Sequence, residues 1–347
     1  MEHSLSWRQI VKKYNKADAR KSNWQLGTTL FLYLLSWVAA YYAYQVSLWA
    51  CLAVAMISQV FYGRLFIFMH DCGHGSFYKS KKARTFIGYL TGTLWFTPYW
   101  QWTKAHATHH RHSGNLEHRG IGDIWTLTVD EYKEASWSMK LRYRLARTPF
   151  FILAVGGFYV FFISQRLYTK EDGKREKKSV LLTNTFIILM ALGISSVTSF
   201  EFYLFYQFFL LYLGASLSVF FFYVQHQYED VYWSDTGSWN YETSALEGSS
   251  CLKLPKIVQY ASGNIGFHHI HHLSHSIPNY NLEMAYKENP LFQKPTVLRL
   301  SDCYACFKLA LIDRKENKMI TFQEYSKKMK DSVQELNSLA QKKSLQA

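Results

Sequence analysis

Two long stretches of this sequence contain almost no charged residues, and they limit the possible folds more than any other feature. Residues 22–63 contain no Asp, Glu, Lys or Arg over 42 positions, and residues 179–228 contain only one, Glu201, over 50 positions. About 20 apolar residues cross a bilayer core as a helix, so each stretch can hold two spans joined by a turn. We therefore expect an all-α integral membrane protein with four spans in two hairpins. The expected spans are about 24–43, 47–68, 180–197 and 202–224.

Basic residues lie on both sides of the first hairpin and before the second, whereas neither turn contains one. Because Lys and Arg accumulate on the cytosolic side of membrane proteins, we expect all four hairpin ends in the cytosol. The polar and basic residues 1–21 are then a cytosolic leader. We expect residues 22–347 to form a single membrane domain, in which a cytosolic helical cap holds the functional site.

Two shorter apolar segments, about 85–103 and 148–165, carry basic residues on both flanks. If one of them crossed the bilayer alone, a basic flank would lie outside. We therefore expect both to be interfacial or re-entrant. Six spans are the alternative arrangement, but they would leave a histidine cluster on the outer side.

Histidine spacing gives the functional signal. Eight of the 14 histidines fall in three groups near the ends of apolar segments, at spacings of three or four residues. Residues so spaced share one helix face. The groups are His70 and His74; His106, His109 and His110; and His268, His271 and His272.

The eight imidazoles of these three groups exceed the four ligands that one structural zinc ion takes, and they suit two metal ions. Iron is the redox-active choice in a reducing cytosol, and a pair of irons can activate dioxygen. His226, at the cytosolic end of the fourth expected span, is a ninth candidate ligand, although a histidine there could simply cap its helix.

The order and spacing of these groups around two membrane hairpins resemble the histidine boxes of membrane fatty acid desaturases. The similarity extends over about residues 63–278. Sequence after the second box is similar to the acyl-lipid, omega-6 type branch of that family, namely Gly114-Asn115-Leu116 and Gly122-Asp123-Ile124-Trp125.

The resemblance implies a di-iron enzyme that uses dioxygen and two electrons to place a cis double bond in a fatty acyl chain. It implies nine histidine ligands: His70, His74, His106, His109, His110, His226, His268, His271 and His272. Some family members have an Asn one helical turn before the residue matching His226, where this chain has Phe222. Asn264 could replace it only if the fold brings it near. Two iron ions are the expected cofactors, and zinc is a possible substitute in purified protein.

Two further sets of residues are candidates around the metal site. Asp71 and Asp123 could each accept the second N–H of a ligand imidazole, or could cap a helix instead. Aromatic residues before the second box could line an acyl channel, or could be ordinary interfacial anchors. These aromatic residues are Trp95, Phe96, Trp100 and Trp102.

The expected partners follow from the same chemistry. The substrate would be a fatty acyl lipid, an acyl-CoA or an acyl carrier, with dioxygen as co-substrate. No heme, flavin or iron–sulfur motif is visible, so electrons would come from a ferredoxin or a small cytochrome. The net charge of +14 favours an acidic partner or an anionic membrane, and long uncharged spans argue against nucleic acid. A bacterial inner membrane is the expected location, with the endoplasmic reticulum as the alternative.

Two alternative functions use the same residues. A hydroxylase or ketolase of the same superfamily would share the ligands and insert oxygen instead of removing a second hydrogen. A histidine-rich metal transporter would place its ligands near the bilayer midplane, where the expected spans contain no histidine.

Overall fold

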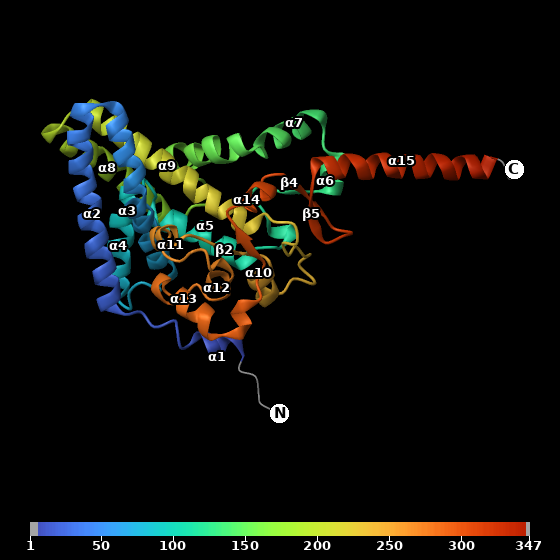
Figure 1. The fold of residues 1–347 in the computed structure, drawn as a ribbon, viewed down its shortest axis with the longest axis horizontal. Helices are drawn as coiled ribbons and strands as arrows, with labels where there is room; N and C mark the ends of the chain where they lie inside the picture. Colours follow the sequence, from blue (N-terminus) through green and yellow to red (C-terminus); the bar gives the residue numbers. More distant parts are fainter. Residues whose placement is uncertain (1–5, 345–347) are drawn as a thin grey trace.

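The computed structural model describes residues 6–344, which are mainly helical (Figure 1). Within these residues, four helices are long and apolar enough to cross a membrane. They are α2 (Ala19–Val46), α3 (Leu48–His74), α8 (Lys174–Val197) and α9 (Phe200–His226). The chain turns back after α2 and after α8, so the prediction of a helical membrane protein with four spans in two hairpins is confirmed.

A serine caps the second helix of each hairpin. Ser47 accepts the N–H of Ala50 at 3.1 Å, and Ser199 accepts the N–H of Phe202 at 3.1 Å. Both serines have extended backbone angles and cap the next helix, which satisfies N–H groups that lack a helical partner. The turns are therefore short, and the two helices of each hairpin run back along one another.

The two hairpins pack together through α3 and α9. A Cβ built on Gly214 of α9 would lie 2.8 Å from Cη2 of Trp95 and 3.0 Å from Cδ1 of Tyr62. Nearby, the hydroxyl groups of Tyr206 and Ser58 share a hydrogen bond of 2.8 Å across the same interface. Because α3 and α9 continue to His74 and His226, this packing brings the histidines at their ends into one region.

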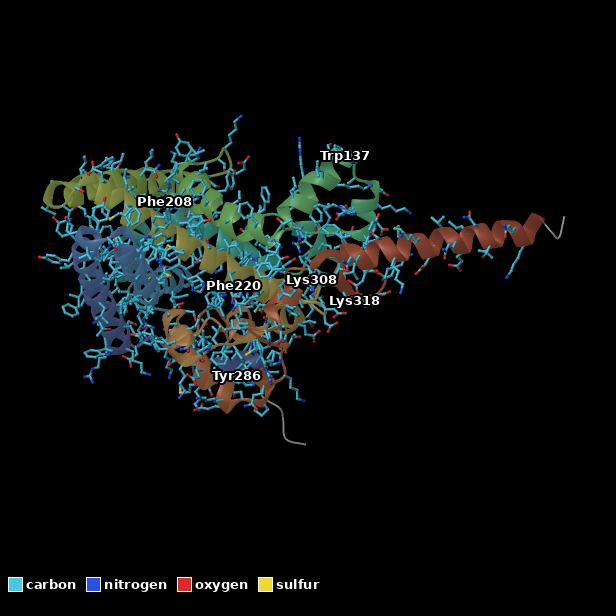
Figure 2. All side chains as sticks on the ribbon, turned by 45° about the horizontal axis from the view of Figure 1, so that its top comes forward. Trp137, Phe208, Phe220, Tyr286, Lys308 and Lys318 are labelled. Carbon is cyan, nitrogen blue, oxygen red and sulfur yellow. The ribbon has the colours of Figure 1, made fainter. Side chains whose placement is uncertain are left out.

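The expected interfacial segments are broken helices. Residues 85–103 fall in α4 (Lys81–Leu94) and α5 (Tyr99–His112), which are separated by a break containing Phe96 at φ 54° and Pro98. The chain also bends by 82° between α7 (Trp137–Ala146) and residues 151–166, which include the π-helical turns Phe151–Gly156 and Tyr159–Ile163. By length and composition this bent pair could count as a fifth span, so its interfacial placement stays a prediction. Trp137 at the start of α7 is 77% exposed (Figure 2).

Shorter elements form a cap at the ends of α3 and α9. The short helices are α1 (Trp7–Val11), α6 (Val129–Glu134), α10 (Tyr241–Glu247), α11 (Lys256–Ala261), α12 (His268–Leu273), α13 (Asn279–Glu288) and α14 (Cys303–Cys306), with 3-10 turns at Leu116–His118 and Pro290–Gln293. A further 3-10 turn, Ser164–Arg166, ends the bent segment before α8. The long helix α15 (Phe322–Ser344) projects from the cap on one side (Figure 1).

The cap also contains two small sheets, which the sequence analysis did not foresee. In one sheet β4 (Leu309–Asp313) lies between β1 (Leu127–Thr128), to which it is parallel, and β5 (Lys318–Thr321), to which it is antiparallel. In the other, β2 (Cys251–Lys253) runs parallel to β3 (Val297–Arg299). The strands have two to five residues, too few for an alternating pattern to be recognised in the sequence.

Candidate metal centre

The first cluster gathers five imidazoles from three helices. One nitrogen from each side chain lies within 4.8 Å of the other four. The Nε2 atom of His271 is 3.0 Å from the Nε2 atoms of both His70 and His110. The Nε2 atoms of His106 and His110 are 3.1 Å apart. The cluster consists of His70 and His74 of α3, His106 and His110 of α5, and His271 of α12.

The second cluster lies beside the first. Nitrogens of His109, His226 and His272 lie within 4.8 Å of one another. The Nε2 atom of His268 is 2.9 Å from that of His226, which makes His268 the fourth imidazole of this group. The structure thus brings all nine predicted ligands together, and it divides them into a set of five and a set of four.

Hydrogen bonds on the far side of the rings determine which nitrogen faces the second cluster. His226 Nδ1 is 3.0 Å from the carbonyl oxygen of Gly248, which can only accept, so Nδ1 carries the proton. His109 Nδ1 is 2.5 Å from Oδ1 of Asp123 and likewise donates to the carboxylate. If both rings are neutral, neither Nε2 atom carries a proton, yet the two Nε2 atoms face each other at 3.3 Å.

Two lone pairs at this distance repel each other unless a cation lies between them. Nitrogens bound at right angles to one ion, with bonds of about 2.1 Å, lie about 3 Å apart. The nitrogen–nitrogen distances of 2.9–3.3 Å in both clusters match this value. The residues therefore fit two metal ions held by neutral imidazoles.

Burial favours the neutral form of five of these rings. Removal from water, reinforced by neighbouring imidazoles, lowers the pKa well below the usual value of a histidine in five cluster residues of α5 and α12. These residues are His106, His110, His268, His271 and His272. A neutral imidazole offers the lone pair that a metal needs, so the environment favours the ligand form.

Both predicted carboxylates contact a cluster imidazole. Asp71 Oδ1 is 3.0 Å from Nδ1 of His70, and its Oδ2 accepts the backbone N–H of Asn279 at 2.8 Å. Since Asn279 begins α13, Asp71 both contacts a predicted ligand and caps the N-terminus of another helix. Asp123 contacts His109, as described above. Second N–H groups held in this way fix the orientation of a ligand ring.

The structure does not bring Asn264 to the cluster as a substitute for the missing family Asn. Its amide donates to the carbonyl of Asn279 at 3.0 Å, and its Oδ1 accepts from Gln259 at 3.1 Å. Asn264 has a φ of 60°, so it forms the turn before α12. Phe222 instead places an aromatic ring 5.0 Å from that of His109 and 5.1 Å from that of His226. Both polar groups of the Asn264 side chain are therefore engaged by Asn279 and Gln259, and its role at the site stays a prediction.

The four aromatic residues of the predicted channel have different positions. Trp102 stacks on His106 with ring centres 4.4 Å apart, so it borders the first cluster. Trp95 is buried and stacks on Tyr62 at 4.3 Å, farther along α3. The guanidinium groups of Arg175 and Arg166 lie 4.2 Å from the ring centre of Trp100 and 5.8 Å from that of Phe96. These contacts point both rings toward the α8 side of the protein. Of the four, Trp102 is the one with described ring contacts to cluster imidazoles, and the channel itself stays a prediction.

His275, which is not among the nine predicted ligands, lies beside the first cluster. Its ring lies 4.8 Å from that of His74 and 5.6 Å from that of His110, although the residue as a whole is exposed. Its position four residues after His271 was the available signal, but α12 ends at Leu273. His269 faces away and contacts the carbonyl oxygen of Phe292 at 2.9 Å.

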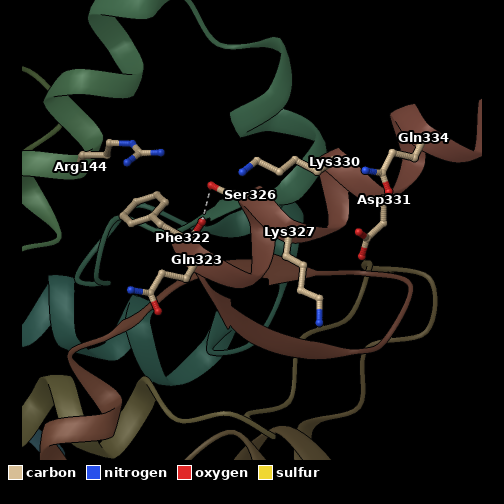
Figure 3. Close-up of a pocket in the computed structure, with 8 residues that line it drawn as sticks. All are labelled: Arg144, Phe322, Gln323, Ser326, Lys327, Lys330, Asp331 and Gln334. Carbon is tan, nitrogen blue, oxygen red and sulfur yellow. Dashed lines mark hydrogen bonds between the residues drawn. The ribbon is translucent and has the colours of Figure 1, made fainter. Parts of the chain in front are cut away.

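Two other features lie apart from this chemistry. A surface hollow of about 450 Å³ between α7 and the start of α15 is lined by Arg144, Phe322 and polar residues of α15, and it contains no predicted ligand (Figure 3). The thiols of Cys303 and Cys306 are buried, which raises the pKa of Cys303 to about 11 and that of Cys306 to about 12. Such thiols remain protonated and are poor metal ligands or redox groups.

Comparison with known proteins gives consistent matches. The family model for fatty acid desaturases matches residues 47–300. A fatty acid desaturase of Bacillus subtilis (strain 168) is 41% identical over 288 residues, which cover 83% of this chain and 82% of the relative. An sn-1 oleoyl-lipid 12-desaturase of Anabaena variabilis is 25% identical over 302 residues, 81% of each chain. An sn-1 acyl-lipid omega-3 desaturase (ferredoxin) of Nostoc sp. (strain 36) is 28% identical over 234 residues, 63% of this chain and 61% of the relative.

Proposed function

Because this chain belongs to the fatty acid desaturase family, we propose that it introduces a cis double bond into a fatty acyl chain with two iron ions held by its nine clustered histidines. It is an oxidoreductase that desaturates fatty acyl chains. The observation that most directly supports bound metal is that the unprotonated Nε2 atoms of His109 and His226 face each other.

Iron suits the donor set. Neutral imidazoles bind iron, copper and zinc, and of these zinc has no redox chemistry. Two bound irons would supply the dioxygen activation needed to remove hydrogen from an unactivated methylene. Zinc can occupy the same nitrogens in purified protein, and it would yield an inactive enzyme.

The reaction consumes one dioxygen, two electrons and two protons. Two hydrogens leave adjacent methylene groups, and the products are one cis double bond and two waters. The chain's own residues hold the metals, orient the ligand rings and exclude water. Asp71 and Asp123 orient His70 and His109, and Trp102 covers the ring of His106.

We propose an acyl group on a membrane lipid as substrate and a ferredoxin as electron donor. The relatives from Nostoc and Anabaena are described as acyl-lipid and oleoyl-lipid desaturases, and the Nostoc protein is described with ferredoxin. The positive charge of this chain, +14, complements a small acidic protein. An acyl-CoA or carrier-bound substrate and a small cytochrome donor are the alternatives that the test below separates.

We also propose that the clusters face the cytosol of a bacterial cell. The five cysteines are all buried, so a cysteine added at an exposed position can be labelled selectively. Val46, at the outer turn of the first hairpin, is 82% exposed, and Ser338 on α15 is exposed. An impermeant maleimide should label Val46→Cys in intact spheroplasts and Ser338→Cys only after permeabilisation. The opposite pattern would reverse the orientation.

The function is tested by expressing the chain in a bacterium that lacks polyunsaturated lipids. Mass spectrometry of intact lipids, acyl-CoA and carrier-bound acyl groups should show a loss of two mass units first in the lipid fraction. His271→Ala should abolish the product. Addition of an oxygen without a new double bond would instead identify a hydroxylase.

A separate assay tests the electron donor. Purified enzyme should turn over with reduced ferredoxin, and turnover only with a cytochrome would contradict the proposal that ferredoxin is the donor.

A further inference from the structure

A buried arginine lies beside the second cluster without a carboxylate partner among its described contacts. Arg147 is 4% exposed and ends α7, where the chain bends by 82°. Burying a guanidinium is costly unless its N–H groups are satisfied, because the charge loses its hydration. A cation kept in such a place needs a specific set of acceptors.

The acceptors of Arg147 come from three separate parts of the chain. Its Nη2 donates to Oε1 of Gln227 at 2.7 Å and to the carbonyl oxygen of Leu309 in β4 at 2.8 Å. Its Nη1 donates to the carbonyl oxygen of Trp125 at 3.3 Å and to Oγ1 of Thr126 at 3.4 Å. One guanidinium therefore joins the loop after α5, the end of α9 and a cap strand.

Two of these contacts lie next to predicted ligands of the second cluster. Gln227 directly follows His226 and donates its amide to the carbonyl oxygen of His226 at 3.0 Å. Thr126 lies three residues after Asp123 in the same loop, and the carboxylate of Asp123 contacts His109. Gln227 Oε1 also accepts the hydroxyl of Thr126 at 3.3 Å, so the loop and the helix end are directly linked.

The first cluster is supported by other residues. There, Asp71 contacts His70 and is held by the backbone and side-chain N–H groups of Asn279 at 2.8 and 2.9 Å. None of the described contacts of Arg147 reaches this network. A defect at Arg147 should therefore affect one metal position more than the other.

We propose that Arg147 is a positioning residue that fixes His109 and His226 relative to each other and so forms the second metal position. This inference rests on the proposed di-iron function. The planar fork of arginine can bind acceptors on two sides at once, which the single ammonium of lysine cannot do in the same geometry. A lysine at position 147 would keep the positive charge but would not hold both sets of acceptors in place.

The test compares full-length wild type, Arg147→Gln, Arg147→Lys and Arg142→Gln, each purified in detergent and loaded with ⁵⁷Fe under anaerobic conditions. Arg142 is exposed on the same helix and provides the matched control. Iron per chain, resistance to a chelator and Mössbauer spectra are measured before any assay of activity. Thermal unfolding reports whether each variant is folded.

Wild type and Arg142→Gln should hold two irons in distinct environments. Arg147→Gln should lose one iron site selectively, and Arg147→Lys should release that same iron about 10–100-fold more readily, as is typical when support of a ligand is lost. Two firmly held irons with unchanged spectra in Arg147→Gln would overturn the proposal. So would parallel loss of both irons with loss of cooperative unfolding, which indicates a purely structural role. Failure of wild type itself to bind two irons would instead reject the proposed function.

Discussion

At the scale of the residue, adjacent histidines serve different clusters. His109 belongs to the second cluster and His110 to the first, and the same division separates His272 from His271. Consecutive residues on a helix point about 100° apart. Two adjacent histidines can therefore direct one ring toward each of two neighbouring metal positions. The doubled histidines of the second and third boxes therefore explain how short helices can supply two neighbouring ions.

Substitution of Asp123 should weaken the second metal position. In Asp123→Ala the Nδ1–H of His109 loses its acceptor, so the ring can rotate or change tautomer. We expect metal affinity at that position to fall about 10–100-fold. Chelator competition followed by metal analysis measures the change.

Asp130→Ala is the matched control for this substitution, because Asp130 is exposed at the start of α6. Its metal affinity should equal that of wild type. Equal retention of both metals in Asp123→Ala would show that the carboxylate does not orient His109.

At the scale of the element, close contact between α9 and α3 sets the position of the helix ends. An alanine at Gly214 would place its Cβ 2.8 Å from Trp95 and 3.0 Å from Tyr62. Overpacking costs about 1–3 kcal/mol, which exceeds the gain of about 0.5–1 kcal/mol when Ala replaces Gly in a helix. We therefore expect Gly214→Ala to lower the unfolding temperature in detergent.

Gly193 of α8 provides the control, since its added Cβ would meet no atom within 4 Å. Gly193→Ala should leave the unfolding temperature unchanged or raise it slightly. If both variants behave alike, the α3–α9 contact is not tightly packed.

At the scale of the whole molecule, the two clusters join segments that are distant in sequence. Imidazoles from α3, α5, α9 and α12 meet there, with lone pairs that repel when no cation is present. A ligand that binds only the folded state stabilises it by about 2.7 kcal/mol at a hundred times its Kd. Metal removal by a chelator should therefore lower the unfolding temperature, and added iron should restore it. Scanning fluorimetry of chelated and reloaded protein measures this, and identical unfolding curves would contradict it.

Much of the architecture was predictable because bilayer thickness and helix geometry act on local sequence. Two stretches of 42 and 50 residues with at most one charged residue identified four spans, spacings of three and four identified eight histidines, and the end of the fourth span identified His226. The short strands were missed because β2 and β3 are three residues each and gain their stability from one another. The partners of Asn264 could not be predicted, because its nearness to His268 in sequence says nothing about which way its side chain points.

The sequence by itself determined that this chain is a helical membrane protein with histidines in three groups, since hydropathy and helical period are properties of neighbouring residues. Only the tertiary structure decided which imidazoles share a metal position and which groups hold their rings. Those relations depend on contacts across more than a hundred residues, such as that between Asp71 and Asn279. No local pattern marks Arg147 either, because its acceptors become neighbours only after the cap has folded.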